Sequence, residues 1–264
     1  MLVSLKEVGK YVDLNGLTPE EIANKLTDAG IEVEEIKYLS NATNLVIGEV
    51  LSSINHPSSD HLHLCKVDIK DEILDIVCGA PNCRKGLKVI VAKVGSKLPG
   101  GEIKESIIRG EPSKGMLCSL KELGVEDKYL TLEQINGIEE LPSDAKVGDT
   151  NVLSYLRLDD VILNLKLLAN RSDCLAIYNI SREIGALFNR KVNIPTYNDK
   201  IDCSIDFKVG STTSKCKVFT GTLFKNITVK ESPRWLKEFL RSEGIRSINN
   251  VVDVGNYIML LTGQ

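Results

Sequence analysis

The strongest constraint on the fold is a change of pattern near residue 45. From there, short apolar runs alternate with clusters of proline, glycine, asparagine and aspartate, a spacing typical of an all-β barrel or sandwich. These runs cover residues 45–54, 62–69, 73–77 and 87–94. Several of their residues are β-branched, and Pro99-Gly100-Gly101 is a strong turn signal. The middle of the chain is therefore expected to consist of short strands.

About 110 residues of this kind fit a five-stranded OB-type β-barrel with a helical insertion. We assign this domain to residues 40–151, because the polar stretch with Pro142, Ser143 and Gly148 closes it. An immunoglobulin-like sandwich is the alternative fold for the same strands.

The 39 residues before the barrel predict two helices followed by a strand. Thr18 to Glu21 combine an N-cap, a proline at the first helical position and the glutamate of a capping box. The apolar run from Ile31 to Leu39 predicts the strand. Fewer than about 40 residues rarely fold alone without disulfides or a bound metal, so this segment is expected to pack against another part of the chain.

The partner is expected to lie after the barrel. Residues 161–167 alternate as one face of a strand, and Ser172 or Asp173 can cap the helix that follows. This piece is again about 40 residues long. We therefore predict one discontinuous α+β domain, made of residues 1–39 and 152–195, into which the barrel is inserted.

Residues 200–264 predict the truncated start of a third, α/β-type domain. Strands are expected at 203–209 and 216–225, then a helix from Ser232-Pro233, and a last apolar stretch from Val251 to Leu261. The helix is expected to turn four side chains inward: Trp235, Leu236, Phe239 and Leu240. These predicted strands and helices do not complete a domain by residue 264.

Composition excludes several classes of protein. No apolar run approaches the roughly 18 residues of a membrane span, and Lys6 and Glu7 interrupt any signal peptide. The seven cysteines include no two-residue-spaced pair, which favours reduced thiols in a cytoplasmic protein without membrane association.

The net charge of −3 conceals two opposite regions. Residues 84–121 hold nine basic and three acidic side chains, a balance of +6, whereas residues 122–149 hold eight acids and two lysines, a balance of −6. The basic stretch, with Lys93 and Lys97, indicates a face for phosphates; an ordinary solvated surface is the alternative. Tyr129 is the only aromatic residue between positions 40 and 150, which favours a folded RNA over stacked single strands.

Reactive motifs are few. His61, His63 and Cys65 would share one face of a strand, but no fourth ligand stands at a defined spacing, so an enzyme with a metal there is the weakest hypothesis. Cys118 has no histidine nearby in sequence, and no phosphate-binding glycine loop is present. We predict no catalytic residue and no metal ligand.

Three segments in order resemble the bacterial phenylalanyl-tRNA synthetase β subunit, in its N-terminal part. The barrel motifs resemble the family's tRNA-binding OB domain: HPSSDHLHLCKVD (56–68), CGAPN (78–82), PGG (99–101) and RGEPSKGMLCS (109–119). ANRSDCLAIYNISREIGAL (169–187) is similar to the helical domain that follows, and SPRWLKEFLRSEGIRSINNVVDVGNYIMLLTGQ (232–264) to the start of the editing domain. The resemblance covers essentially the whole chain.

The resemblance implies an aminoacyl-tRNA ligase, phenylalanine–tRNA ligase, built from two α and two β chains. In that family the α subunit uses ATP and magnesium to charge tRNA(Phe), and the β subunit binds tRNA and edits mischarged tRNA. This chain would then be a fragment that binds no cofactor and holds no complete active site. The editing residues would lie beyond Gln264.

Four residues match positions that relatives of this OB domain use for RNA: Asn82, Ser113, Lys114 and Met116. Arg109 opens the same loop, in which backbone N–H groups and Lys114 could face a phosphate. Lys93 and Lys97 join the candidate set through the basic stretch. The alternative function is a complete, stand-alone tRNA-binding or chaperone-like protein with the same barrel.

Overall fold

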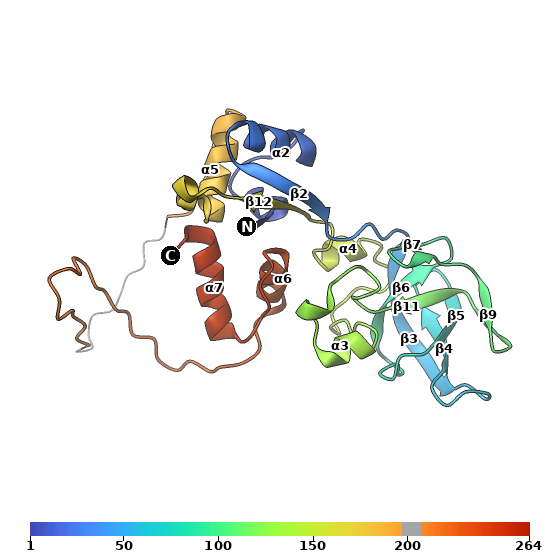
Figure 1. The fold of residues 1–264 in the computed structure, drawn as a ribbon. Helices are drawn as coiled ribbons and strands as arrows, with labels where there is room; N and C mark the ends of the chain where they lie inside the picture. Colours follow the sequence, from blue (N-terminus) through green and yellow to red (C-terminus); the bar gives the residue numbers. More distant parts are fainter. Residues whose placement is uncertain (197–206) are drawn as a thin grey trace.

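The structure is a computed structural model that describes residues 1–196 and 207–264. It has mixed α and β structure, with a curled sheet on one side and a three-stranded sheet with helices on the other (Figure 1). Two helices near the C-terminus lie beside the three-stranded sheet. Most of the strand predicted at 203–209 lies outside the described residues.

The larger sheet is antiparallel, with the order β11-β6-β3-β4-β5. Its strands are β3 (Leu45–Asn55), β4 (His63–Asp68), β5 (Ile73–Cys78), β6 (Lys88–Lys93) and β11 (Gly115–Cys118). The sheet curls until its edges meet. The backbone N–H of Lys114, just before β11, donates to the carbonyl of Asp75 in β5 over 2.8 Å. One curled sheet replaces the two facing sheets of an immunoglobulin-like sandwich, so that alternative is wrong. We call this sheet and its loops the barrel.

The curl depends on close approach at Gly48 of β3. A Cβ atom there would lie 2.8 Å from Val91 Cγ2 and 2.9 Å from Val67 Cγ1. The residues that face inward from the neighbouring strands, such as Val67, Val89 and Val91, are fully buried. Only glycine fits where β3 crosses its partners this closely.

Short elements complete the barrel. Two small hairpins pair β7 (Lys97–Leu98) with β8 (Gly101–Glu102), and β9 (Ser106–Ile108) with β10 (Glu111–Ser113). The predicted helical insertion contains η1 (Asp127–Tyr129) and α3 (Leu132–Asn136). After it, α4 (Val152–Tyr155) leads out of the barrel.

The smaller sheet combines strands from both sides of the barrel. The central strand β12 (Val161–Lys166) pairs antiparallel with β1 (Leu2–Ser4) and β2 (Glu32–Tyr38). Helices α1 (Leu5–Val8), α2 (Pro19–Asp28) and α5 (Ile177–Leu187) share one apolar core with it. The predicted capping box is confirmed: Thr18 and Glu21 bond reciprocally at the start of α2. We call this assembly the three-stranded unit.

Two local predictions in the three-stranded unit are wrong. The first residues form β1 before any helix. Helix α5 begins at Ile177 rather than after Ser172 or Asp173, and the irregular 3-10 segment η2 (Ala169–Cys174) precedes it. The backbone of Arg171 is not helical there (φ −120°, ψ 37°), and the Arg171 guanidinium binds the Asp173 carboxylate, so that side chain does not cap the helix.

Helices α6 (Arg234–Ser242) and α7 (Asn250–Thr262) pack against the three-stranded unit. Leu236, Phe239 and Leu240 are buried as predicted, but Trp235 is 49% exposed, so its inward placement is wrong. Residues 216–225 form no strand, so that prediction is wrong. Within the described residues, the helices are too short or too polar to span a membrane.

Candidate nucleic-acid interface

A cavity of about 510 Å³ opens where the two edges of the barrel sheet meet. Its walls come from the end of β5, the β7–β8 and β9–β10 hairpins, the start of β11 and the loop after α3. Ser113 and Met116 line it, as do Gly115 and Gly137. Two of the predicted site residues therefore border a single hollow on the barrel.

The loop of Ser113 to Met116 has a fixed backbone. Ser113 is 2% exposed; its Oγ accepts from the Val77 N–H over 3.1 Å and donates to the Gly115 carbonyl over 3.1 Å. Ser113 therefore positions the loop, and its hydroxyl is already bonded. The Lys114 side chain is exposed beside it, and Met116 is half-buried in the cavity wall.

Asn82 closes another wall of the barrel. Its Nδ2 donates to the Ile138 carbonyl over 2.9 Å and to Glu140 Oε1 over 3.1 Å, and its Oδ1 accepts from the Ile138 N–H over 3.0 Å. Gly137 makes room for this clamp, because a Cβ there would lie 2.6 Å from Asn82 Oδ1. The polar atoms of Asn82 are thus engaged inside the protein.

The three remaining predicted cations lie on different edges of the barrel. Arg109, at the turn between β9 and β10, donates from Nη1 to the Ser58 carbonyl over 2.9 Å. Lys93 ends β6 opposite Gly115 of β11, and Lys97 begins the β7–β8 hairpin. Among the described residues, the ammonium groups of Lys93, Lys97 and Lys114 lie within 4 Å of no carboxylate. They are available to phosphates.

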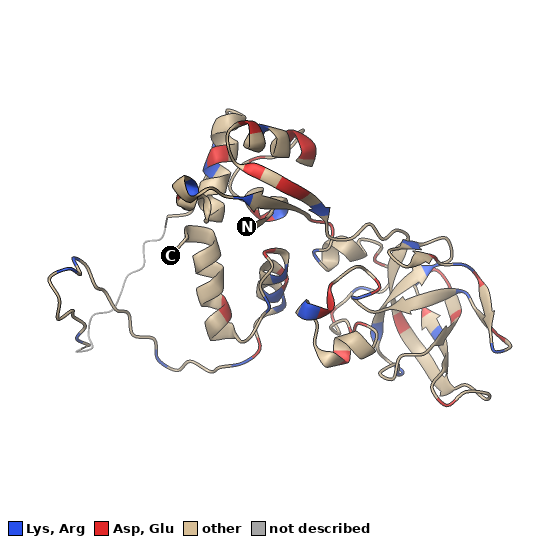
Figure 2. Ribbon diagram, viewed as in Figure 1, with Lys and Arg blue, Asp and Glu red and all other residues tan. Residues whose placement is uncertain are grey.

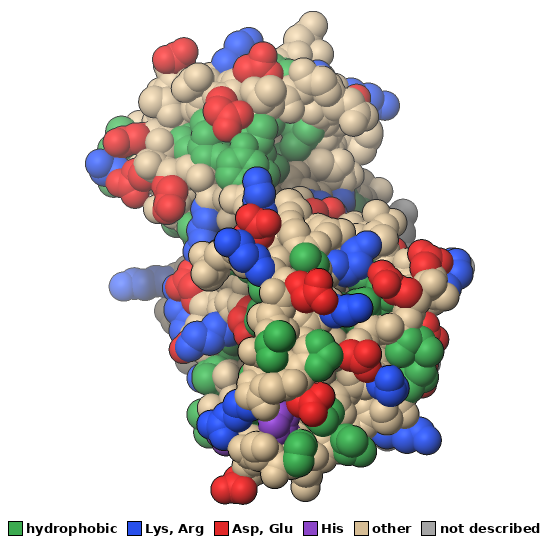
Figure 3. Space-filling model, turned by 90° about the vertical axis from the view of Figure 1, so that its right-hand side faces the viewer, with side chains coloured by type: hydrophobic (Ala, Val, Ile, Leu, Met, Phe, Trp, Pro, Cys, Tyr) green, Lys and Arg blue, Asp and Glu red, His purple; other side chains and the backbone are tan. Residues whose placement is uncertain are grey.

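The acidic stretch folds back onto the basic one, which the sequence order did not reveal. Arg84 binds Glu140 with two bonds of 2.6 Å each, and this pair lowers the pKa of the Glu140 carboxyl. Lys121 pairs with Asp127 at 2.9 Å. Lys88 donates to the backbone carbonyls of residues 143 and 145. On the barrel face that lies at the right of Figure 1, basic and acidic side chains are interspersed (Figure 3).

The +6 balance of residues 84–121 is therefore partly neutralised in space. What stays without an ion-pair partner among the described residues is a smaller set of cations on the barrel, among them Lys93, Lys97 and Lys114. No signal in the sequence marks Arg84 and Glu140 as partners, because 56 residues separate them.

The histidines do not gather into the predicted motif. His56 is buried and its Nδ1 accepts from the Ser58 N–H over 3.0 Å, whereas His61 is exposed. Cys65 points into the barrel core, where its Sγ lies 3.4 Å from Cys83 Sγ. His61, His63 and Cys65 therefore do not converge on a common point.

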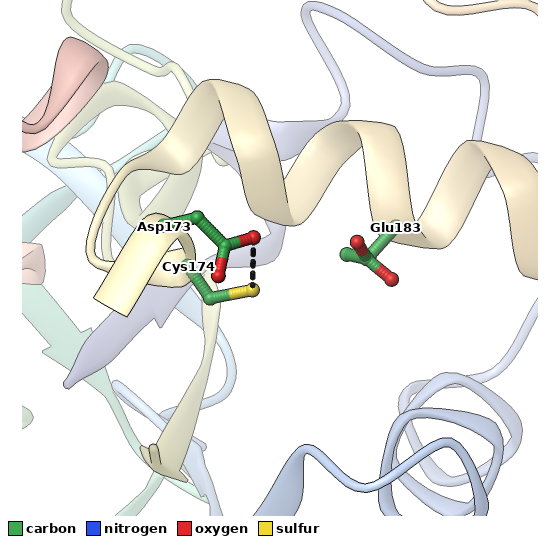
Figure 4. A group of neighbouring side chains, drawn as sticks. All are labelled: Asp173, Cys174 and Glu183. Atoms are coloured by element: carbon green, nitrogen blue, oxygen red, sulfur yellow. Dashed lines mark hydrogen bonds between the residues drawn. The ribbon is translucent and has the colours of Figure 1, made fainter. Parts of the chain in front are cut away.

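Within the described residues, one group brings three possible metal ligands within 4.8 Å of one another: Asp173, Cys174 and Glu183 (Figure 4). Arg171 already binds this group, donating to Asp173 over 3.2 Å and to Glu183 over 2.7 Å. A thiol is also a poor ligand for magnesium, which prefers oxygen. This donor set does not fit a magnesium site.

Two family profiles match the chain. The putative tRNA binding domain matches residues 45–150, and the B3/4 domain matches residues 215–264. The first range contains the whole barrel sheet and the cavity described above.

Curated relatives match over the whole chain. The chain is 44% identical to the phenylalanine–tRNA ligase beta subunit of Halalkalibacterium halodurans, with 100% of this chain and 33% of that protein covered. The corresponding subunits of Geobacillus kaustophilus and Bacillus subtilis are 43% and 42% identical, again over 100% of this chain and 34% of each relative. The chain spans about a third of the length of the curated relatives it matches.

Proposed function

Since the chain belongs to the family of phenylalanine–tRNA ligase β subunits, we propose that it forms the N-terminal part of such a subunit and contributes tRNA binding through its barrel. The observation that carries this proposal is the identity of 42–44% over the full chain. The tRNA-binding profile supports it, because its range coincides with the barrel.

In this proposal the chain has three parts. Residues 40–151 are the tRNA-binding OB domain, residues 1–39 with 152–195 form one discontinuous domain, and residues 200–264 begin the editing domain. The pairing of β12 with β1 and β2 supports the second part. The B3/4 profile over residues 215–264 supports a separate third part.

The chain acts together with an α subunit, in an assembly of two α and two β chains in the cytoplasm. ATP and magnesium serve the aminoacylation site of the α subunit, and this part of the β chain binds neither.

We assign phosphate contacts to Lys93, Lys97, Arg109 and Lys114, because these cations lie on the barrel and none of them forms an ion pair among the described residues. Asn82 and Ser113 shape the walls, since their polar atoms bond within the protein. Met116 offers apolar surface in the cavity wall. Backbone charge and shape dominate this kind of RNA recognition.

The test measures tRNA affinity of the full chain as a function of salt. If about five phosphates are contacted, the log–log slope is expected at about −3.5 to −4.5, at roughly −0.7 to −0.9 per phosphate. The triple variant Lys93→Glu, Lys97→Glu, Lys114→Glu is expected to bind tRNA at least ~10-fold more weakly, with a flatter slope.

The matched control is Lys166→Glu, which reverses a charge on the three-stranded unit and should leave affinity unchanged. Equal affinity and slope for the triple variant and the wild type would remove the barrel from the tRNA interface. Co-purification with an α subunit then separates the subunit function from a stand-alone tRNA-binding protein, because only the former requires a stable complex.

A further inference from the structure

Two cysteine thiols from different segments of the barrel are in direct contact. Cys65 lies on β4 and Cys83 lies in the loop between β5 and β6, and their Sγ atoms are 3.4 Å apart. Both side chains belong to one apolar cluster of the barrel core, where they are 3% and 6% exposed. The proposed tRNA binding uses neither thiol.

The contact needs little movement to become covalent. The two sulfurs of a disulfide lie about 2.05 Å apart, so Cys65 Sγ and Cys83 Sγ would have to approach by roughly 1.4 Å. Cys65 is fixed in a strand that is paired on both sides, with β3 and with β5. Cys83 lies outside the strands, so rotation of its side chain is the movement that closes this gap.

A serine hydroxyl connects the same two sulfurs. Ser53 of β3 lies directly opposite Cys65 in the β3–β4 pair. The Cys65 thiol donates to Ser53 Oγ over 3.8 Å, and Ser53 Oγ donates to Cys83 Sγ over 4.0 Å. A proton that leaves Cys65 therefore has an acceptor within reach, and Cys83 has a donor that favours its thiolate.

The two thiols differ in acidity in the direction that oxidation requires. Hydrogen bonds from the thiols of Cys65 and Cys78 lower the pKa of Cys83. The hydrogen bond to Cys83, followed by burial, raises the pKa of Cys65. Since the thiolate is the form that attacks a peroxide, Cys83 is the thiol that reacts first and Cys65 is the thiol that resolves the product.

We propose that Cys65 and Cys83 form a peroxide-sensitive dithiol site, at which a hydroperoxide converts the two thiols into a disulfide. With hydrogen peroxide, the Cys83 sulfur takes one oxygen and becomes a sulfenic acid, and the first water leaves. The Cys65 sulfur then attacks the Cys83 sulfur, the S–S bond forms, and the S–O bond breaks. The hydroxyl group leaves as a second water with the proton of Cys65. Two thiols are thus oxidised to one disulfide, and one peroxide is reduced to two waters.

The disulfide would attach the loop between β5 and β6 to β4. The same loop carries Asn82, whose amide bonds with the backbone of Ile138 in the cavity wall. Oxidation is therefore expected to make this wall more rigid, and a thiol reductant reverses it by exchange. The bond is measured without RNA, so its test is independent of the proposed tRNA binding.

The experiment treats the reduced full chain with hydrogen peroxide, removes the excess, and alkylates the remaining thiols in denaturant. Peptide mapping is expected to show Cys65 linked to Cys83, with loss of both free thiols and their recovery after dithiothreitol. Amide exchange in residues 79–87 should slow at least ~10-fold in the oxidised chain, because the crosslink opposes local opening of the loop.

The chain contains its own matched controls. Cys118 is also fully buried, and its Sγ donates to the Met116 carbonyl over 3.8 Å, so it should be recovered as an alkylated thiol. Cys83→Val keeps an apolar side chain in the core and should abolish both the crosslink and the slower exchange. Cys216→Ser removes an exposed thiol and should leave the crosslink unchanged.

The mapping of the wild type decides the proposal even if Cys83→Val misfolds. Recovery of Cys65 and Cys83 as free thiols after peroxide treatment would overturn it, and so would their separate oxidation to sulfinic acids. A disulfide that joins Cys83 to Cys78, to Cys216 or to a second chain would overturn the assigned pairing in the same way.

Discussion

The barrel and the three-stranded unit satisfy their charged groups in different ways. In the barrel, ion pairs such as Arg84–Glu140 lie at the surface and join segments of one continuous stretch of chain. In the three-stranded unit and the helices packed on it, the carboxylates of Glu7, Asp160 and Glu243 are at most 5% exposed. Acidic residues also recur along β2 and α2 of this unit (Figure 2).

These buried carboxylates connect segments far apart in the sequence. Asp160 accepts from Ser4 Oγ over 2.5 Å and from the Lys6 N–H over 3.1 Å. Glu243 of the segment after α6 accepts from the Ser4 N–H over 3.1 Å. Burial raises the pKa of both Asp160 and Glu243. The barrel is joined mainly by its own strands, whereas the three-stranded unit and the helices packed on it bury polar hydrogen bonds between distant segments, at a cost when the carboxyl is charged.

The largest effect is expected from Leu163→Ala in the three-stranded unit. Leu163 is fully buried at the centre of β12, between Val3 of β1 and Ile36 of β2. Truncation should destabilise the unit by about 3 kcal/mol through lost burial and a cavity. Hydrogen exchange should then rise together in all three strands and stay low in the barrel.

The exposed Leu168 provides the matched control, since Leu168→Ala should change exchange little. If exchange rises equally in β3 to β6, the two regions unfold as one and the contrast between them fails.

A somewhat smaller effect is expected in the barrel from Gly48→Val. The added side chain would overlap Val67 and Val91, and overpacking of this kind costs about 1–3 kcal/mol. The urea midpoint should fall, and exchange should rise in the barrel first. Gly100→Val is the control, because nothing lies within 4 Å of a Cβ there. Equal midpoints for the two variants would show that the curl does not depend on Gly48.

The smallest effect is expected from Glu243→Gln, with a pH dependence that only the three-stranded unit should show. When folding raises the pKa of a carboxyl, the protonated carboxyl stabilises the folded state. This stabilisation is lost as the pH rises through the folded-state pKa. Glu243 Oε2 also has no hydrogen-bond partner among the described residues. The variant should therefore be more stable than the wild type by about 1 kcal/mol at neutral pH, because glutamine is neutral and avoids the cost of protonating the buried carboxyl there or of burying its charge.

The measurement is urea unfolding between mildly acidic and neutral pH. The difference in unfolding free energy between variant and wild type should shrink toward acid, where Glu243 is protonated in both the folded and the unfolded state. Exposed Glu35 supplies the control variant Glu35→Gln. Parallel pH profiles for the wild type and Glu243→Gln would contradict a raised pKa at this position.

Much of the local structure followed from the sequence. The capping box of Thr18 and Glu21, the apolar strand runs and the glycine turns specify elements through short-range physics, and these were placed correctly. The predicted cap of α5 failed because the Asp173 carboxylate binds Arg171 instead. The predicted burial of Trp235 was wrong because helical periodicity does not show where the neighbouring core ends.

The sequence predicted only part of the candidate site. The loop that carries Ser113, Lys114 and Met116 does border the cavity, but the bonds that engage Asn82 and Ser113 come from partners 36 to 58 residues away. The same is true of the contact between Cys65 Sγ and Cys83 Sγ, since these two residues are 18 positions apart in the sequence.

The sequence by itself determined the kinds of elements, their order and the family, because propensity, capping and motif spacing act over a few residues. The tertiary structure alone decided which charges cancel, which buried side chains meet and which distant segments share a sheet. Those outcomes depend on side chains that are close in space while distant along the chain, and on burial, which sets whether a charge must find a partner.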